Sequence, residues 1–202
     1  MSVRRSSPAP VQPDLLGGGQ GPDQVHRLFF ALLPGESVCQ QVEAAAKSVA
    51  AAQHLRARMT RPSRYHVTLH FLGDHPMLRD DLVRAAITAA GKIQASPFDL
   101  VLDQASAFHG REPPCVLRCS EVPAGLQALW NDLRQALVLA GLGAHVSRNF
   151  TPHLTYAYSR GAAPQPAPVS PIAWRAEGFA LLHSVVGGGD YQVLDAWRFQ
   201  PA

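Results

Sequence analysis

The chain has 202 residues, with 18 lysines and arginines against 15 aspartates and glutamates, and a net charge of +3. This length allows one domain with a substantial core, while so small a charge disfavours a broad duplex-binding surface yet tolerates an anionic substrate. The three cysteines lack zinc-site spacing, and their odd number disfavours a disulfide framework, so we expect a reducing, cytoplasmic setting. No secretory signal or membrane-spanning apolar run is expected, and hence no membrane partner.

Residues 1 to about 25 are rich in Pro, Gly, Ser and Gln, which predicts a disordered tail ahead of one domain over 26–202. The elements predicted after it are, in chain order, a strand over 27–33, a helix over 36–52, a strand over 65–72, a helix over 78–93, strands near 98–102 and 115–119, a helix from about 123 to 141, a strand over 153–158, a mobile loop over 161–171, and strands near 177–186 and 191–199 joined by a glycine-rich hairpin. This order indicates an α/β or α+β protein made of two similar halves.

Two of the predicted strands carry a His-x-Thr tripeptide, at residues 66–68 and 153–155. Residues i and i+2 of a strand point to the same face, so His66 lies beside Thr68, and His153 lies beside Thr155. If the two strands face each other, two imidazoles and two hydroxyls surround one small space. Two histidines can divide the roles of acid and base near neutral pH, so the pattern predicts acid–base catalysis.

An arginine precedes each motif by five residues: Arg61 before the first and Arg148 before the second. A lone His-x-Thr occurs often by chance, and two unrelated strands with locally hydrogen-bonded histidines are the alternative explanation. The recurrence of the motif on two predicted strands, each time with an arginine at the same offset, favours a shared site.

The chain resembles the 2H phosphoesterases, and among them the bacterial and archaeal RNA 2′,3′-cyclic phosphodiesterases, also called 2′-5′ RNA ligases. The resemblance extends from about residue 27 to 199 and is carried by the segments 27–34, 66–73, 148–155 and 184–194. It implies a bilobal fold with pseudo-two-fold symmetry, in which each lobe is a sheet with flanking helices and one His-x-Thr strand at the central cleft. It also implies hydrolysis of a 2′,3′-cyclic phosphate to a 2′-phosphomonoester, with no metal and no other cofactor.

The resemblance implies a role for each motif residue. His66 is the expected general acid, which protonates the 3′ oxygen, and His153 is the expected general base, which activates water. The sequence alone allows these two roles to be exchanged. Thr68 and Thr155 are the expected hydrogen-bond donors to the phosphate oxygens.

Charge and stacking groups are expected around the motifs. Arg148 is the expected cationic phosphate ligand, and Phe150 is the expected surface for base stacking.

Two positions depart from the family pattern. The family commonly has an arginine five residues after the second histidine, where this chain has Tyr158 and its nearest arginine is Arg160. Four residues after the first histidine stands His70, predicted on the motif face as a third pocket imidazole or a solvated strand histidine.

We therefore expect a monomeric phosphodiesterase that acts on RNA ends or small 2′,3′-cyclic nucleotides. A second enzymatic alternative is 2′-5′ joining of RNA ends, in which a ribose hydroxyl replaces water. A third alternative, favoured only by Tyr158, is an RNA-end binding protein with little turnover. A metal hydrolase is disfavoured despite nine histidines, because the chain has no His-Glu-x-x-His motif and no paired-cysteine spacing.

Overall fold

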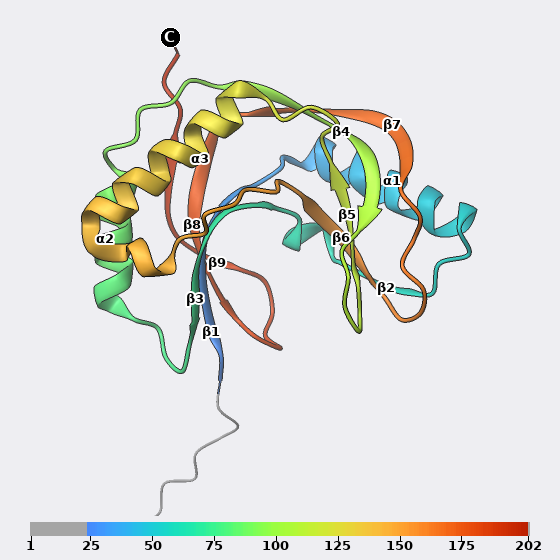
Figure 1. Cartoon of the computed structure of the whole chain (residues 1–202), viewed down its shortest axis with the longest axis horizontal. Coiled ribbons are helices and arrows are strands. Elements are labelled where there is room, and N and C mark those ends of the chain that lie inside the picture. Colours follow the sequence, from blue (N-terminus) through green and yellow to red (C-terminus); the bar gives the residue numbers. More distant parts are fainter. Residues whose placement is uncertain (1–23, 202) are drawn as a thin grey trace, which may run out of the picture.

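A computed structural model describes residues 24–201 of the protein (Figure 1). The disordered tail predicted over residues 1–25 lies outside these described residues, except for its last two positions. One large antiparallel sheet and three main helices make up most of the described chain, which confirms an α+β fold. None of the helices in residues 24–201 is both long and apolar enough to cross a membrane.

Nine strands between residues 24 and 201 form the sheet, in the order β7-β4-β5-β6-β3-β1-β8-β9, with the short β2 paired to β6. Neighbouring strands run antiparallel throughout. The two motif strands, β3 and β6, are neighbours at the middle of the sheet. The bounds of the strands are β1 His26–Leu32, β2 Ala57–Met59, β3 Val67–His75, β4 Phe98–Ala107, β5 Pro114–Arg118, β6 Leu154–Ser159, β7 Ala167–Ala176, β8 Gly178–Val185 and β9 Gln192–Arg198.

Apart from the short β2, the sheet consists of two four-stranded halves that meet at one residue pair. In one half the order is β3-β1-β8-β9, and in the other it is β7-β4-β5-β6. Val67 of β3 pairs with Leu154 of β6, and both side chains are buried in the core. Because side chains alternate along a strand, the residues on either side of Val67 and Leu154 point to the opposite face of the sheet.

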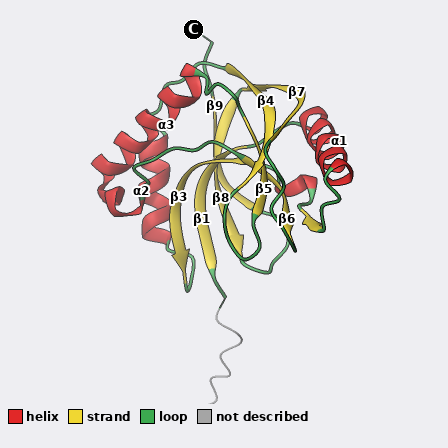
Figure 2. Ribbon diagram, turned by 45° about the vertical axis from the view of Figure 1, so that its right-hand side comes forward, coloured by secondary structure: helices red, strands yellow, loops and turns green. Residues whose placement is uncertain are grey.

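Three helices cover the sheet, and Figure 2 shows α2 and α3 together on one side of the molecule and α1 on the other. The apolar spacing of α1 predicted its bounds, and its buried residues Val42, Ala46 and Val49 follow that spacing. Gly141, with a φ of 81°, ends the helical run after α3, near the predicted end. The bounds of the helices are α1 Glu36–Ala52, α2 Asp80–Ala90 and α3 Ala124–Leu137.

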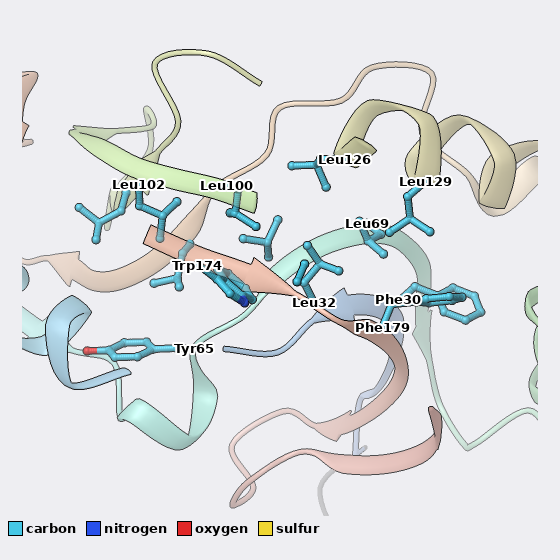
Figure 3. Close-up of a cluster of buried hydrophobic side chains, with 14 of the residues drawn as sticks. Phe30, Leu32, Tyr65, Leu69, Leu100, Leu102, Leu126, Leu129, Trp174 and Phe179 are labelled. Carbon is cyan, nitrogen blue, oxygen red and sulfur yellow. The ribbon is translucent and has the colours of Figure 1, made fainter. Parts of the chain in front are cut away.

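A continuous hydrophobic core joins the helices to the sheet. Figure 3 shows side chains that converge from several strands and from α3, among them Phe30, Leu69, Leu100, Leu126 and Trp174. Each leucine or phenylalanine side chain that is fully buried contributes roughly 1.5–3 kcal/mol. This core anchors both motif strands from one face, so the other face is free to carry polar groups.

The predicted mobile loop over 161–171 is wrong in its second half, because β7 already begins at Ala167 and pairs with β4. Its prolines, Pro168 and Pro171, favoured a loop interpretation. They are tolerated because β7 is an edge strand, where a missing N–H can face away from the neighbouring strand. Edge position is a property of the assembled sheet, which the local composition does not reveal.

Candidate active site

The two motifs meet across the pairing of β3 with β6, which joins the central residues of the two tripeptides. Continued by one residue in each direction, this antiparallel register places His66 across from Thr155. The same register places Thr68 across from His153. All four side chains line one cavity, and this register sets the two histidines diagonally across from each other.

A β-bulge follows the threonine in each motif strand. In β3 the extra residue is Leu69, so Leu69 and His70 both reach the core and Phe71 returns to the motif face. In β6 the extra residue is Tyr156, and Tyr158 returns to the motif face in the same way. A bulge changes the strict alternation of side chains. Both motifs consequently place an aromatic ring on the motif face five residues after the histidine.

One open cavity of about 720 Å³ lies on this face, and both histidines and both threonines line it. Its lining also includes four arginines and, among the described residues, a single aspartate. Positive charge thus exceeds negative charge in the wall, which suits an anionic ligand. Within residues 24–201 no group of three or more His, Cys, Asp or Glu residues is arranged to hold a metal ion.

His66 is enclosed by aromatic rings. Its ring centroid lies 5.1 Å from that of Phe29 and 5.2 Å from that of Tyr191. This desolvation lowers the pKa of His66 to about 4, and the nearby charges of His153 and Arg64 act in the same direction. The Nδ1 atom lies 2.8 Å from the backbone oxygen of Arg64, which can only accept a hydrogen bond. Nδ1 therefore carries a proton, and Nε2 is the atom left for chemistry.

His153 has a matching arrangement in the other half of the sheet. Its Nδ1 lies 2.8 Å from the backbone oxygen of Thr151, two residues earlier, as in the first motif. The ring of Phe108 meets it edge to face at 4.7 Å between centroids. Desolvation, with a contribution from the charge of Arg118, lowers the pKa of His153. Both histidines therefore use the same ring nitrogen for orientation and keep Nε2 for the cavity.

Arg64 ties the β8–β9 hairpin to the first motif. Its guanidinium lies 4.2 Å from the ring centroid of Tyr191, and it donates hydrogen bonds to the carbonyl of Gly189 and, at 3.3 Å, to Ser184 Oγ. Asp190 of the same hairpin lies 3.3 Å from Arg61. These contacts hold the hairpin against one side of the cavity, so Arg64 organises the wall around His66.

The structure does not bring Arg148 and Phe150 to this cavity. Arg148 lines a separate hollow over the outer face of α3, and Phe150 stacks on Trp130 of α3 with 5.1 Å between ring centroids. Arg134 of α3 also donates to the backbone oxygen of Ser147 at 3.2 Å. The segment that leads into β6 therefore runs along α3. As a result Arg148, although it precedes His153 by five residues, lies outside the cavity that contains the two histidines. The geometry does not support the expected phosphate and stacking roles of this pair.

His70 does not lie on the motif face, and the prediction that placed it there is wrong. Its side chain is 1% exposed, stacks on Trp130 and has Nε2 3.0 Å from the backbone oxygen of Trp130. The bulge at Leu69 turns it to the core. Strict alternation was the basis of the prediction, and a bulge is set by the pairing with the neighbouring strand rather than by the local pattern.

Sequence reasoning assigned no role to several cavity residues, notably Arg27, Arg58, Arg64 and Tyr191. Arg58 lies on a strand of only three residues, Ala57–Met59, which is too short to show an alternating pattern. The others come from strands and turns outside the two motifs. The residues of 184–194 that contribute to the family resemblance were the available signal for Tyr191.

The fold and the site define an α+β protein in which two His-x-Thr strands share one cationic cavity. A profile of the 2′-5′ RNA ligase superfamily matches residues 34–186. The chain therefore belongs to this superfamily, that of the 2H phosphoesterases.

Solved structures with the same fold agree with this membership. E. coli LigT in its apo form is 26% identical, with a TM-score of 0.69, and the match covers 87% of this chain and 98% of that one. E. coli LigT complexed with 3′-AMP has 26% identity and a TM-score of 0.70 over 87% and 98% of the two chains. TT0787 of Thermus thermophilus, with 24% identity and a TM-score of 0.68 over the same shares, has the same fold. No match was found among curated proteins.

Proposed function

We propose that this protein hydrolyses 2′,3′-cyclic phosphodiester ends of RNA to 2′-phosphomonoesters by paired-histidine acid–base catalysis. The observation that carries the proposal is the matched presentation of the two histidines. In both, Nδ1 donates to a backbone carbonyl two residues earlier, and the ring lines the same cationic cavity. A structure of the related E. coli LigT holds 3′-AMP, a nucleoside phosphate.

The proposed reaction uses one proton transfer at each histidine. His153 Nε2 accepts a proton from water as the water oxygen attacks phosphorus. The bond between phosphorus and the 3′ oxygen breaks, and the proton on His66 Nε2 passes to that oxygen, which leaves a 2′-phosphate. Thr68 and Thr155 donate hydrogen bonds to the non-bridging oxygens. Solvent then returns the two imidazoles to their starting states.

The low pKa of His66 is compatible with its role as the acid. In the free protein this imidazole is neutral at pH 7, because its pKa is about 4. A bound phosphodiester anion favours the imidazolium and raises this pKa. Once protonated, an imidazole of intrinsically low pKa is a strong proton donor. In this proposal the anionic substrate completes the acid at His66, and the lowered pKa of His153 favours the neutral form that a base requires.

The test is hydrolysis of an RNA oligonucleotide that ends in a 2′,3′-cyclic phosphate, in EDTA, with products separated against 2′- and 3′-phosphate standards. We expect a 2′-phosphate from the wild type and a loss of roughly 10²–10⁴ in rate for His66→Ala and for His153→Ala. The double variant should lose little more than either single variant, because the two groups act as a unit. His54→Asn is the matched control, since His54 is exposed outside the cavity and its φ of 48° suits asparagine.

Two outcomes would redirect the proposal. Binding without turnover by a folded wild type would favour an RNA-end binding protein. Formation of a longer product when an oligonucleotide with a 5′-hydroxyl is added would favour 2′-5′ joining, in which a ribose hydroxyl takes the place of water. The same pair of histidines would serve that reaction, so both variants should lose it together.

A further inference from the structure

The edge formed by β2 and β6 presents a cation that the proposed reaction does not use. Arg58 of β2 is paired with Tyr158 of β6, and its guanidinium lies 4.8 Å from the centroid of the tyrosine ring. Both residues line the cavity that contains the two histidines. The aromatic face holds the guanidinium plane in place while its N–H groups remain available.

The other arginines of the cavity are already engaged. Arg27 donates two hydrogen bonds to Asp74, at 2.8 and 2.9 Å, and Arg61 lies 3.3 Å from Asp190. Arg64 donates to the β8–β9 hairpin. The arginine of β2, by contrast, has no side-chain hydrogen bond or ion pair with any residue between 24 and 201. The β2–β6 side is therefore where the cavity wall presents a guanidinium whose N–H groups are not taken up by hydrogen bonds within residues 24–201.

Two more arginines continue this edge away from the cavity. The backbone N–H of Arg160 donates to the backbone oxygen of Arg56 at 2.7 Å, so the two lie opposite each other just beyond the pair of Arg58 with Tyr158. Ala57 and Ser159, which separate the two pairs, face inward, whereas Arg56 and Arg160 are both exposed. Because side chains alternate, the three arginines share one face and form a short row that leads out of the cavity, with Arg58 first and Arg56 and Arg160 side by side beyond it.

This row lies farther along β6 than the threonine that is proposed to bind the reacting phosphate. Because of the bulge at Tyr156, the segment from Thr155 to Tyr158 lies opposite two steps of β5, from Val116 to Pro114, which corresponds to about 7 Å of strand. A guanidinium stacked on Tyr158 and a hydroxyl at Thr155 therefore contact different groups of a ligand. A polyanion with regularly spaced charges matches such a row, whereas a ligand with one phosphate leaves it empty.

We infer that the β2–β6 edge binds the backbone of the RNA segment that precedes the cyclic end. Arg58 takes the phosphate on the 5′ side of the reacting nucleotide, and Arg56 and Arg160 together take the phosphate before it. This rests on the proposed function and adds to it that the preferred substrate is a single-stranded oligonucleotide end rather than a cyclic mononucleotide. Arg58 is thus a specificity residue that contacts substrate away from the reacting atoms.

The experiment compares three substrates in EDTA: a nucleoside 2′,3′-cyclic phosphate, the same compound with a 5′-phosphate, and a trinucleotide that ends in the cyclic phosphate. For the wild type we expect kcat/KM to rise along this series. Arg58→Ala should reduce kcat/KM about tenfold on the second and third substrates and change it less than about twofold on the first. The double variant Arg56→Ala, Arg160→Ala should lose activity only on the trinucleotide. Arg84→Ala, which removes an arginine from the surface of α2, controls for net charge.

Salt dependence provides a second measurement of the same contact. The slope of log(kcat/KM) against log(salt) on the trinucleotide should become shallower by about 0.7 in Arg58→Ala, as expected for one lost contact to a single strand. The inference is overturned if Arg58→Ala reduces all three substrates equally, or if it changes none of them.

A failure of the proposed function can be recognised separately. If the wild type turns over none of the three substrates, that proposal fails, and the inference is judged from binding alone. The probes are then a labelled trinucleotide with a 2′-phosphate end and the corresponding nucleoside 2′-phosphate, measured by anisotropy and competition. Tighter binding of the trinucleotide that disappears in Arg58→Ala supports the inference, and equal affinities overturn it.

Discussion

The partly buried position of His66 between two aromatic rings should make the stability of the fold depend on pH. Between the rings of Phe29 and Tyr191 its pKa is lowered to about 4, whereas in the unfolded chain a histidine titrates near 6.5. Below pH 6.5 the unfolded state therefore binds a proton that the folded state excludes. The contribution to stability is complete above pH 6.5 and is lost as the pH falls towards 4.

The two pKa values set the size of this effect. Proton linkage predicts that His66 lowers the free energy of unfolding by about 2 kcal/mol at pH 5 and about 3 kcal/mol at pH 4, relative to pH 7.5. Domains of this kind have a total stability of about 5–15 kcal/mol, so the loss is measurable by urea unfolding. His153 acts in the same direction because its pKa is also lowered, so the comparison requires a variant.

The informative variant is His66→Asn, because asparagine can still donate to the backbone oxygen of Arg64 but does not titrate. Between pH 7.5 and 5, the free energy of unfolding of His66→Asn should fall by about 2 kcal/mol less than that of the wild type. Equal pH dependence in the two proteins would refute the argument that burial suppresses protonation of His66.

Sulfate, whose charge is constant over this range, should bind the wild type more tightly as pH falls, because a bound anion favours the imidazolium.

Three further variants test separate features. Arg64→Ala should raise KM about tenfold and speed amide exchange in the β8–β9 hairpin, because a charged hydrogen-bonding anchor is lost; an unchanged hairpin would contradict this role. Gly178→Ala should lower stability by about 1–3 kcal/mol in urea unfolding, since its Cβ would clash with the backbone oxygen of Trp197, whereas Gly35→Ala meets nothing within 4 Å. His70→Phe should keep kcat/KM within about twofold of the wild type, because this side chain faces the core; a large loss would place it back in the site.

The elements with a complete local signal were predicted best. The helix over 36–52 has the same bounds in the structure, because its apolar spacing and the preceding proline are both local. The two motif strands were also predicted from their own residues, although each begins one residue after its histidine, and each histidine lines the cavity together with its threonine. Alternation over three residues requires no knowledge of neighbouring strands.

Predictions that extended beyond a few residues from the motifs were less successful. The bulges after Thr68 and Thr155 reverse the alternation, so His70 faces the core while Phe71 and Tyr158 face the cavity. A bulge arises from the pairing of two strands, and β1 and β5 are distant in sequence from the strands they bend.

The sequence by itself determined that two histidines and two threonines are presented in matched pairs, because that depends on residue type and on a period of two. Only the tertiary structure decided which charged groups surround them. In the tertiary structure Arg148 lies over α3, outside the cavity, and the three-residue strand β2 places Arg58 beside Tyr158 in the cavity wall. Cavity walls are formed by contacts between distant segments, and the register of those contacts depends on how the whole sheet packs against its core.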